Sequence, residues 1–185
     1  MTSIIKVNTI QDVGGNNLLI SNGSGTITTN NIAGENTPSF YATLSSNISD
    51  FTANQYNTIV FDSERWDTNS DYNNSTGIFT PSVAGKYFCY AQAKMGNFGD
   101  GGGSKFMTLA FFWNGTSTQT GQTNIEANGE TTIIASNIIT FNGRTDNIQV
   151  RGYQNDGAGT RFVVGGHGGS AAAYSFFHAF RIIGA

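Results

Sequence analysis

The chain has 185 residues, of which only 11% are charged, and its formal net charge is -3 at pH 7. Aromatic residues make up 12% of it, whereas disordered chains are poor in aromatics and rich in charge, so disorder is excluded for most of the chain. The acidic balance argues against a nucleic-acid-binding protein, because such proteins carry a basic patch. The single cysteine, Cys89, excludes a disulfide scaffold and a cysteine-only zinc site. No apolar run approaches the roughly 20 residues that span a bilayer, so we expect no membrane insertion.

Strands are the only regular elements that the sequence predicts. Apolar residues never keep helical spacing for three turns without Gly, Asn or β-branched interruptions. Short runs of Ile, Val, Thr, Phe and Tyr lie between Gly, Asn and Asp instead, as is typical of strands. In chain order, we expect strands at Ile4–Ile10, Phe40–Leu44, Thr58–Phe61, Gly77–Thr80, Lys86–Lys94, Lys105–Trp113, Gln119–Ile125, Thr131–Phe141, Asn147–Gln154, Thr160–Val164 and Ala173–Ile183. This spacing predicts an all-β sandwich or a closed barrel.

Residues 1–36 differ from the rest of the chain. They contain no aromatic residue, and their few apolar residues lie among Gly-Gly, Asn-Asn and Asn-Gly-Ser-Gly runs. Such a segment cannot bury enough apolar area alone to offset about 1–2 kcal/mol of backbone entropy per ordered residue. We therefore expect 1–36 to be a short, extended, β-rich anchoring segment that packs on copies of itself or on another protein, and 37–185 to be the main domain.

Several later strands are apolar on both faces. Phe88 and Tyr90 alternate with Tyr87 and Cys89, and the run Phe176–Phe180 reads FFHAF. A strand that is apolar on both faces needs cover on both. In a sandwich of this size, another subunit often supplies the second cover, and the low charge is typical of obligate interfaces.

The main domain resembles the globular head of complement component one-q, within the tumour-necrosis-factor-like jelly rolls. The most specific segment is Gly77–Phe88, which reads GIFTPSVAGKYF where the family has Gly-x-Phe, a Pro, and then Gly-x-Tyr-x-Phe. Further matches are Ser39–Ala42, Ile59–Asp62 followed by Asp67 and Tyr72, the hairpin Asn142–Val150, and Phe177–Ile182 near the C-terminus. The resemblance implies a ten-stranded jelly-roll sandwich that forms a homotrimer.

The N-terminal segment resembles the leaders of marine tailed-phage virion proteins. The matching runs are IKVNTIQ at Ile5–Gln11 and SNGSGTI at Ser21–Ile27. The first ten residues also lack the basic leader and apolar core of a signal peptide, as expected of a protein assembled in the host cytoplasm and released by lysis. We expect a virion protein that binds other virion proteins through residues 1–36. Three roles remain open. The first choice is a short trimeric tail fibre, the second a capsid decoration or head-fibre protein, and the third a polysaccharide depolymerase.

The sequence contains few residues that could support catalysis. Cys89 lies in an apolar strand, where we expect a small buried hydrophobe rather than a nucleophile. Asp67–Asp71 begins like a calcium loop, but Tyr72 and Ile78 occupy the positions that need Gly and Glu. His167 is either an exposed loop histidine or, in three copies near a threefold axis, a metal ligand. The sequence predicts no enzyme, no cofactor and no metal site.

Receptor contact is the function that we expect of the long polar loops, although each could also be a hairpin connection without a ligand. The loops span Gly96–Ser104, Asn114–Gly129 and Asn155–Ser170. Gly, Asn, Ser and Thr allow adaptable hydrogen bonding to a host cell-surface glycan or protein, and nearby aromatic rings allow stacking. The candidate receptor-binding residues are Asp100, Trp113, Tyr153, Asp156 and His167.

Overall fold

The computed structural model describes residues 7–21, 23–24, 27–29, 37–49, 51–96, 105–125, 130–155, 162–165 and 174–183. Within these ranges all the regular secondary-structure elements are strands. No helix in the described residues is long and apolar enough to cross a membrane. The strands are, in chain order, β1 (Thr9–Gln11), β2 (Asn17–Ser21), β3 (Ile27–Thr29), β4 (Ser39–Thr43), β5 (Tyr56–Thr58), β6 (Ser63–Asp67), β7 (Tyr72–Asn73), β8 (Ile78–Phe79), β9 (Gly85–Gly96), β10 (Lys105–Trp113), β11 (Thr116–Ile125), β12 (Thr131–Phe141), β13 (Ile148–Gln154), β14 (Phe162–Val164) and β15 (Phe176–Arg181). The chain divides into two compact units, Met1–Glu35 and Asn36–Ala185.

The N-terminal unit is a three-stranded antiparallel sheet in the order β1-β2-β3. The turn between β1 and β2 is fixed by Asp12, whose carboxylate accepts hydrogen bonds from the backbone and side-chain amides of Asn16. No side chain described in this unit is buried, and Val7, Ile10 and Leu18 are each more than 40% exposed. The described part of this unit therefore has strands but no hydrophobic core of its own.

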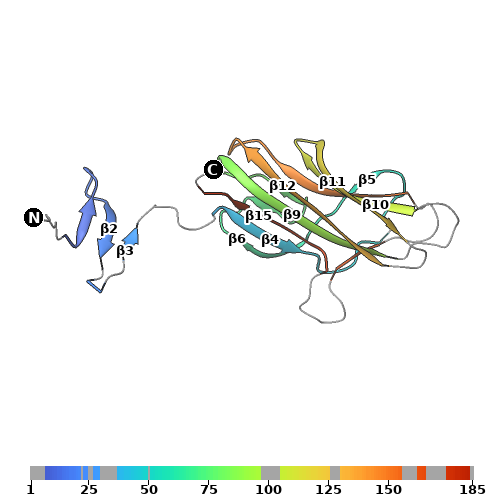
Figure 1. Ribbon diagram of the computed structural model, residues 1–185, viewed down its shortest axis with the longest axis horizontal. Coiled ribbons are helices and arrows are strands. Elements are labelled where there is room, and N and C mark those ends of the chain that lie inside the picture. Colours follow the sequence, from blue (N-terminus) through green and yellow to red (C-terminus); the bar gives the residue numbers. More distant parts are fainter. Residues whose placement is uncertain are drawn as a thin grey trace, which may run out of the picture. The chain divides into compact units, whose positions relative to one another are not determined.

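The second unit contains two antiparallel sheets. The β9 sheet has the order β12-β9-β15-β4-β6, with the short strand β14 beside β9. The β13 sheet has the order β11-β10-β13-β8-β7, with the short strand β5 beside β13. Figure 1 shows β4, β15, β9 and β12 side by side in one layer. The two main paths hold ten strands, and β5 and β14 add one three-residue strand to each sheet.

The hydrophobic core lies between these two sheets and is rich in aromatic rings. Phe40 of β4 stacks on Tyr72 of β7 with ring centroids 4.6 Å apart. Phe177 of β15 contacts Phe111 of β10 at 5.9 Å. Both contacts join one sheet to the other, and full burial of a side chain of this size contributes about 1.5–3 kcal/mol. Cys89 also lies in this core and is fully buried, as the sequence predicts.

Turn chemistry explains one difference from the expected strands. Asn114 and Gly115 both have positive φ, 48° and 81°, so they form the tight two-residue turn that an Asn-Gly pair favours. The chain returns at once along β10 as strand β11, with one β-bulge or irregularity in the pairing between Phe111 and Phe112. The structure therefore confirms the strand expected at Gln119–Ile125 and extends it to Thr116, and the overlapping expectation of a long loop beginning at Asn114 is wrong over 116–125.

Candidate functional site

The outward side of the β9 sheet carries a continuous group of rings, which we call the aromatic face. Its members come from four neighbouring strands and alternate with core residues. They are Tyr41, Trp66, Phe88, Tyr90, Phe176, His178 and Phe180. The strand register brings them together, because His178 pairs with Tyr41 on one side and with Tyr90 on the other.

Ring contacts run across the aromatic face without a break. Trp66 stacks on Tyr41 at 5.0 Å, and Tyr90 stacks on Phe176 at 5.6 Å and on His178 at 5.2 Å. Phe180 extends the group by contacting Phe88 at 5.5 Å. Such pairs favour each other by about 0.5–1.5 kcal/mol beyond their burial. The face is therefore an ordered layer of rings.

Part of this layer is open to solvent in the single chain. Trp66 is 51% exposed, and Ile134 and Ile138 of the adjacent strand β12 are 48% and 57% exposed. Charged side chains of β9 lie only at its two ends, at Lys86 and Lys94, and Lys94 forms an ion pair of 2.5 Å with Glu130. A contiguous exposed apolar patch with a polar rim marks an interaction site.

His178 lies at the centre of the aromatic face. Rings of Tyr41, Phe88, Tyr90, Phe176 and Phe180 surround it at centroid distances between 5.2 and 6.4 Å. Burial lowers the pKa of His178 below its ordinary value of 6.5, since the charged imidazolium loses hydration there. The neutral imidazole thus serves as one more flat ring in the layer.

The outward side of the β13 sheet carries a second ring group, which we call the Tyr153 face. It consists of Tyr56, Phe106, Phe112, Arg151 and Tyr153. Phe106 stacks on Tyr153 at 5.7 Å, and Tyr153 contacts Tyr56 at 5.4 Å. Tyr56 contacts Phe112 at 4.9 Å, and the Arg151 guanidinium carbon lies 4.3 Å from the centre of the Phe112 ring.

The structure describes two of the five candidate receptor-binding residues. Tyr153 lies on the outward side of β13, half-buried, and its hydroxyl donates a 3.5 Å hydrogen bond to Asn54. Trp113 ends β10 on the core side, where it packs against the hydrophobic core. Asp100, Asp156 and His167 lie outside the described residues. No sequence pattern marks Tyr56, Phe112 or Arg151, which join Tyr153 through contacts across three strands.

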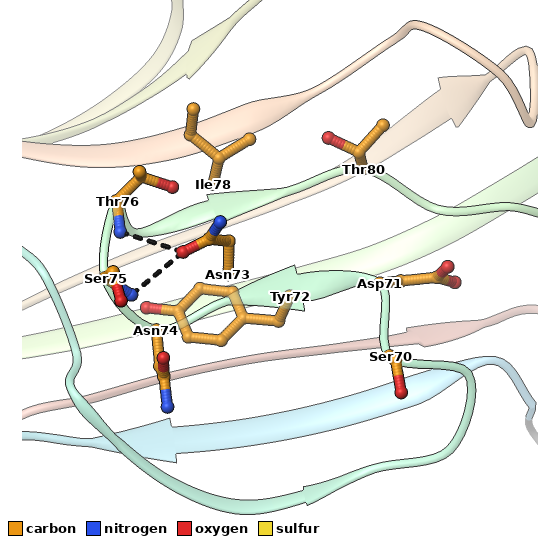
Figure 2. A pocket seen from close by; sticks show the side chains of 9 residues that line it. All are labelled: Ser70, Asp71, Tyr72, Asn73, Asn74, Ser75, Thr76, Ile78 and Thr80. Carbon is orange, nitrogen blue, oxygen red and sulfur yellow. Dashed lines mark hydrogen bonds between the residues drawn. The ribbon is translucent and has the colours of Figure 1, made fainter.

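An open pocket of about 690 Å³ lies at the β7–β8 hairpin. Figure 2 shows that the Asn73 amide is turned onto its own hairpin, where its oxygen accepts hydrogen bonds from the backbone of Ser75 and Thr76. The Tyr72 hydroxyl donates to the carbonyl of Phe61, and Asp71 accepts a hydrogen bond from Ser82. These polar groups of Asp71, Tyr72 and Asn73 are therefore engaged in hydrogen bonds within the fold.

Two described groups of kinds that often serve catalysis or metal binding, Cys89 and Asp62, are buried or hydrogen-bonded. No three His, Cys, Asp or Glu side chains gather within the described ranges. Burial raises the pKa of the Cys89 thiol, which keeps it protonated. The carboxylate of Asp62 is engaged by the backbone and hydroxyl of Ser45. The two ring-bearing faces are thus the candidate functional surfaces.

Comparisons with known proteins bear on the fold. No family model and no curated protein matches this chain. The globular domain of zebrafish complement 1qA aligns with a TM-score of 0.54 and 15% identity, over 78% of this chain and 97% of that one. Murine APRIL at pH 5.0 aligns with a TM-score of 0.54 and 10% identity, over 78% of this chain and 98% of that one. The Eiger TNF of S. frugiperda aligns with a TM-score of 0.54 and 11% identity, over 80% of this chain and 93% of that one.

The chain has the C1q/TNF jelly-roll fold. This confirms the all-β jelly roll expected from the sequence, and the ten strands of the two main paths form it. At these identities the likeness concerns the fold alone. Within the jelly roll, the aromatic face is the outward side of one sheet and the Tyr153 face is the outward side of the other.

Proposed function

We propose that this protein is a non-enzymatic homotrimer in a tailed-phage virion, where it forms a short tail fibre that displays its jelly roll for recognition of the host surface. The observation that carries the proposal is the aromatic face. Its layer of seven rings lacks cover from the described residues, and the exposed side chains Ile134 and Ile138 extend it. In the proposed trimer each aromatic face packs against a neighbouring copy.

A trimer suits the shape and chemistry of this face. Interfaces between permanently associated subunits resemble a hydrophobic core that has been cut in half, with charge kept to the rim. The lysines at the two ends of β9 provide such a rim. Head-to-tail contacts between identical subunits close into a ring when the rotation permits, and the family resemblance of the main domain implies a ring of three.

The N-terminal unit supports the place of this trimer in a virion. Its described strands bury no side chain, and Val7, Ile10 and Leu18 are exposed. A sheet this small needs a further hydrophobic surface for stability. Other virion proteins would provide that surface, which agrees with the resemblance of this segment to the leaders of phage virion proteins.

Deletion of residues 1–35 tests the proposal. The truncated protein should remain folded and trimeric but should be missing from purified virions, whereas the full chain should be found at the tail in a whole-virion density map. Normal incorporation of the truncated protein would overturn the anchoring role. Density on the capsid would replace the tail-fibre assignment by that of a decoration protein.

A further inference from the structure

The Tyr153 face differs chemically from an interface between copies. Its rings do not form an uninterrupted apolar layer, because the Arg151 guanidinium lies against Phe112 and polar side chains lie between the strands' aromatic positions. Tyr56 is 39% exposed, while Phe112 beneath it is only 9% exposed. An exposed ring therefore rests on a buried ring, which fixes its orientation towards solvent.

Arg151 gives this face a positive charge. It is the one charged member of the Tyr153 face, and its neighbours across the strands are Ala110 and Thr58. Its Nη2 donates a 2.9 Å hydrogen bond to Gln149, and its Nε, which is buried, has no hydrogen-bond partner within the described part of the chain. A guanidinium has five N–H donors and no acceptor, so an incoming carboxylate is its natural complement.

Tyr56 and Arg151 lie within reach of one ligand, because both contact Phe112. The register explains this proximity: Arg151 pairs with Thr58 on β5, two residues from Tyr56 and on the same side of the sheet. On its other side Arg151 pairs with Ala110, whose small side chain leaves room for the Phe112 ring and the guanidinium above the sheet. The two groups place an exposed aromatic ring and a guanidinium side by side.

We propose that the Tyr153 face binds an acidic polysaccharide, with the apolar side of a uronic-acid ring stacked on the exposed Tyr56 ring and its carboxylate bound by Arg151. This inference rests on the proposed role in host-surface recognition and names the ligand class. A sugar ring has one apolar side and a rim of hydroxyls, which matches rings flanked by Gln149 and Thr58. A carboxylate on that ring complements the single positive charge of the face.

Binding of the full chain to oligogalacturonate, with neutral maltohexaose as the matched probe, tests this proposal. Titration calorimetry should give measurable binding of the acidic saccharide and weaker binding of the neutral one. Tyr56→Ala should weaken acidic-saccharide binding by about 3- to 10-fold, as expected for the loss of one stacked ring. Arg151→Gln should weaken it by about 10-fold or more and abolish the preference over maltohexaose.

A matched control comes from Lys94, which lies over the Tyr174 ring at 4.4 Å and so reproduces the arrangement of a cation on an aromatic ring elsewhere in the fold. Lys94→Gln should bind oligogalacturonate like the parent protein. Each variant is first checked for the parental melting temperature. Chemical-shift mapping on the parent protein needs no substitution, and the saccharide should shift the signals of Tyr56, Arg151 and Tyr153.

Three results would overturn the proposal: no binding of oligogalacturonate at millimolar concentration, an unchanged preference in Arg151→Gln, or saccharide-induced shifts confined to other residues. Shifts of Tyr56 and Tyr153 that depend on protein concentration alone would assign this face to a second copy and also overturn it. The saccharide experiments use purified protein alone, whereas the deletion of residues 1–35 tests incorporation into virions. A failure of the saccharide proposal can therefore be distinguished from a failure of the proposed virion role.

Discussion

The two outward faces of the jelly roll both display aromatic rings, yet their surroundings differ. On the aromatic face the rings follow one another across four strands, with lysines only at the ends of β9. On the Tyr153 face the rings share the surface with Arg151 and with amide and hydroxyl groups. An uninterrupted apolar layer favours burial against a neighbouring copy of the protein, whereas rings among polar groups suit a hydrated ligand. Aromatic content alone therefore does not identify the role of a sheet face.

A charge placed at equivalent positions should separate the two faces most strongly. Tyr90→Asp puts a carboxylate at the centre of the aromatic face, where the proposed trimer would bury it without a partner, at a cost of about 3–5 kcal/mol per subunit. We expect this variant to be a monomer by light scattering. Tyr153→Asp is the matched change on the other face and should leave the trimer intact. Equal effects of the two substitutions would refute the distinction between the faces.

The seam between the two sheets offers a second test. A Cβ added at Gly121 of β11 would lie 2.2 Å from the backbone oxygen of Ile134 on β12, so a strand of one sheet would have to move away from a strand of the other. Gly121→Ala should lower the free energy of unfolding by about 1–3 kcal/mol or more. It should also weaken the trimer, because Ile134 borders the aromatic face. Chemical denaturation measures the first effect, and light scattering measures the second.

Acidification should weaken the aromatic face through His178. Burial lowers the pKa of this imidazole below 6.5, so the unfolded chain takes up a proton at a pH where the folded chain does not. Stability should therefore fall as the pH decreases through 6.5 towards the folded pKa, by about 1.4 kcal/mol for each unit between the two pKa values. Thermal melts between pH 7.5 and 5.5 measure this loss. The slope should disappear in His178→Phe, and its persistence there would assign it to another group.

The smallest effect is expected at the Tyr153 hydroxyl. The hydroxyl donates a 3.5 Å hydrogen bond to Asn54, which is longer than an ordinary O–H···O bond. Tyr153→Phe keeps the ring and its contacts with Tyr56 and Phe106. We therefore expect the free energy of unfolding to change by no more than about 0.5 kcal/mol, which gives only a small shift of the melting temperature. A larger loss in a thermal melt would mean that the hydroxyl has a structural role and that Tyr153 is not chiefly a stacking surface.

The features of the fold that depend on local residue patterns, such as individual strands and their two sides, could be predicted from the sequence. Alternation along Lys86–Lys94 indicated a strand with apolar residues on both sides, and β9 has Cys89 in the core and Tyr90 outside. The strand β6 was missed, because Ser63–Asp67 reads SERWD and its charges suggested a loop. Its edge position explains the charges, which edge strands use to discourage unwanted pairing.

The Tyr153 face was beyond prediction for a different reason. Tyr56 and Phe112 are far apart in sequence and meet only because β5 and β10 both flank β13. Nothing in the residues around Tyr56 signals that neighbour, and Arg151 joins the group through the same register. Tyr153 itself was predicted from its aromatic ring near a polar loop. Trp113 met the same criterion, yet strand alternation directs it to the core side of β10.

Sedimentation equilibrium of the full-length protein at micromolar concentration tests the central claim most directly, namely that the aromatic face is buried between three copies. The account predicts a mass three times the 19.7 kDa of one chain for the parent protein and a single-chain mass for Tyr90→Asp. A well-folded parent protein that sediments as a 19.7 kDa monomer would contradict it.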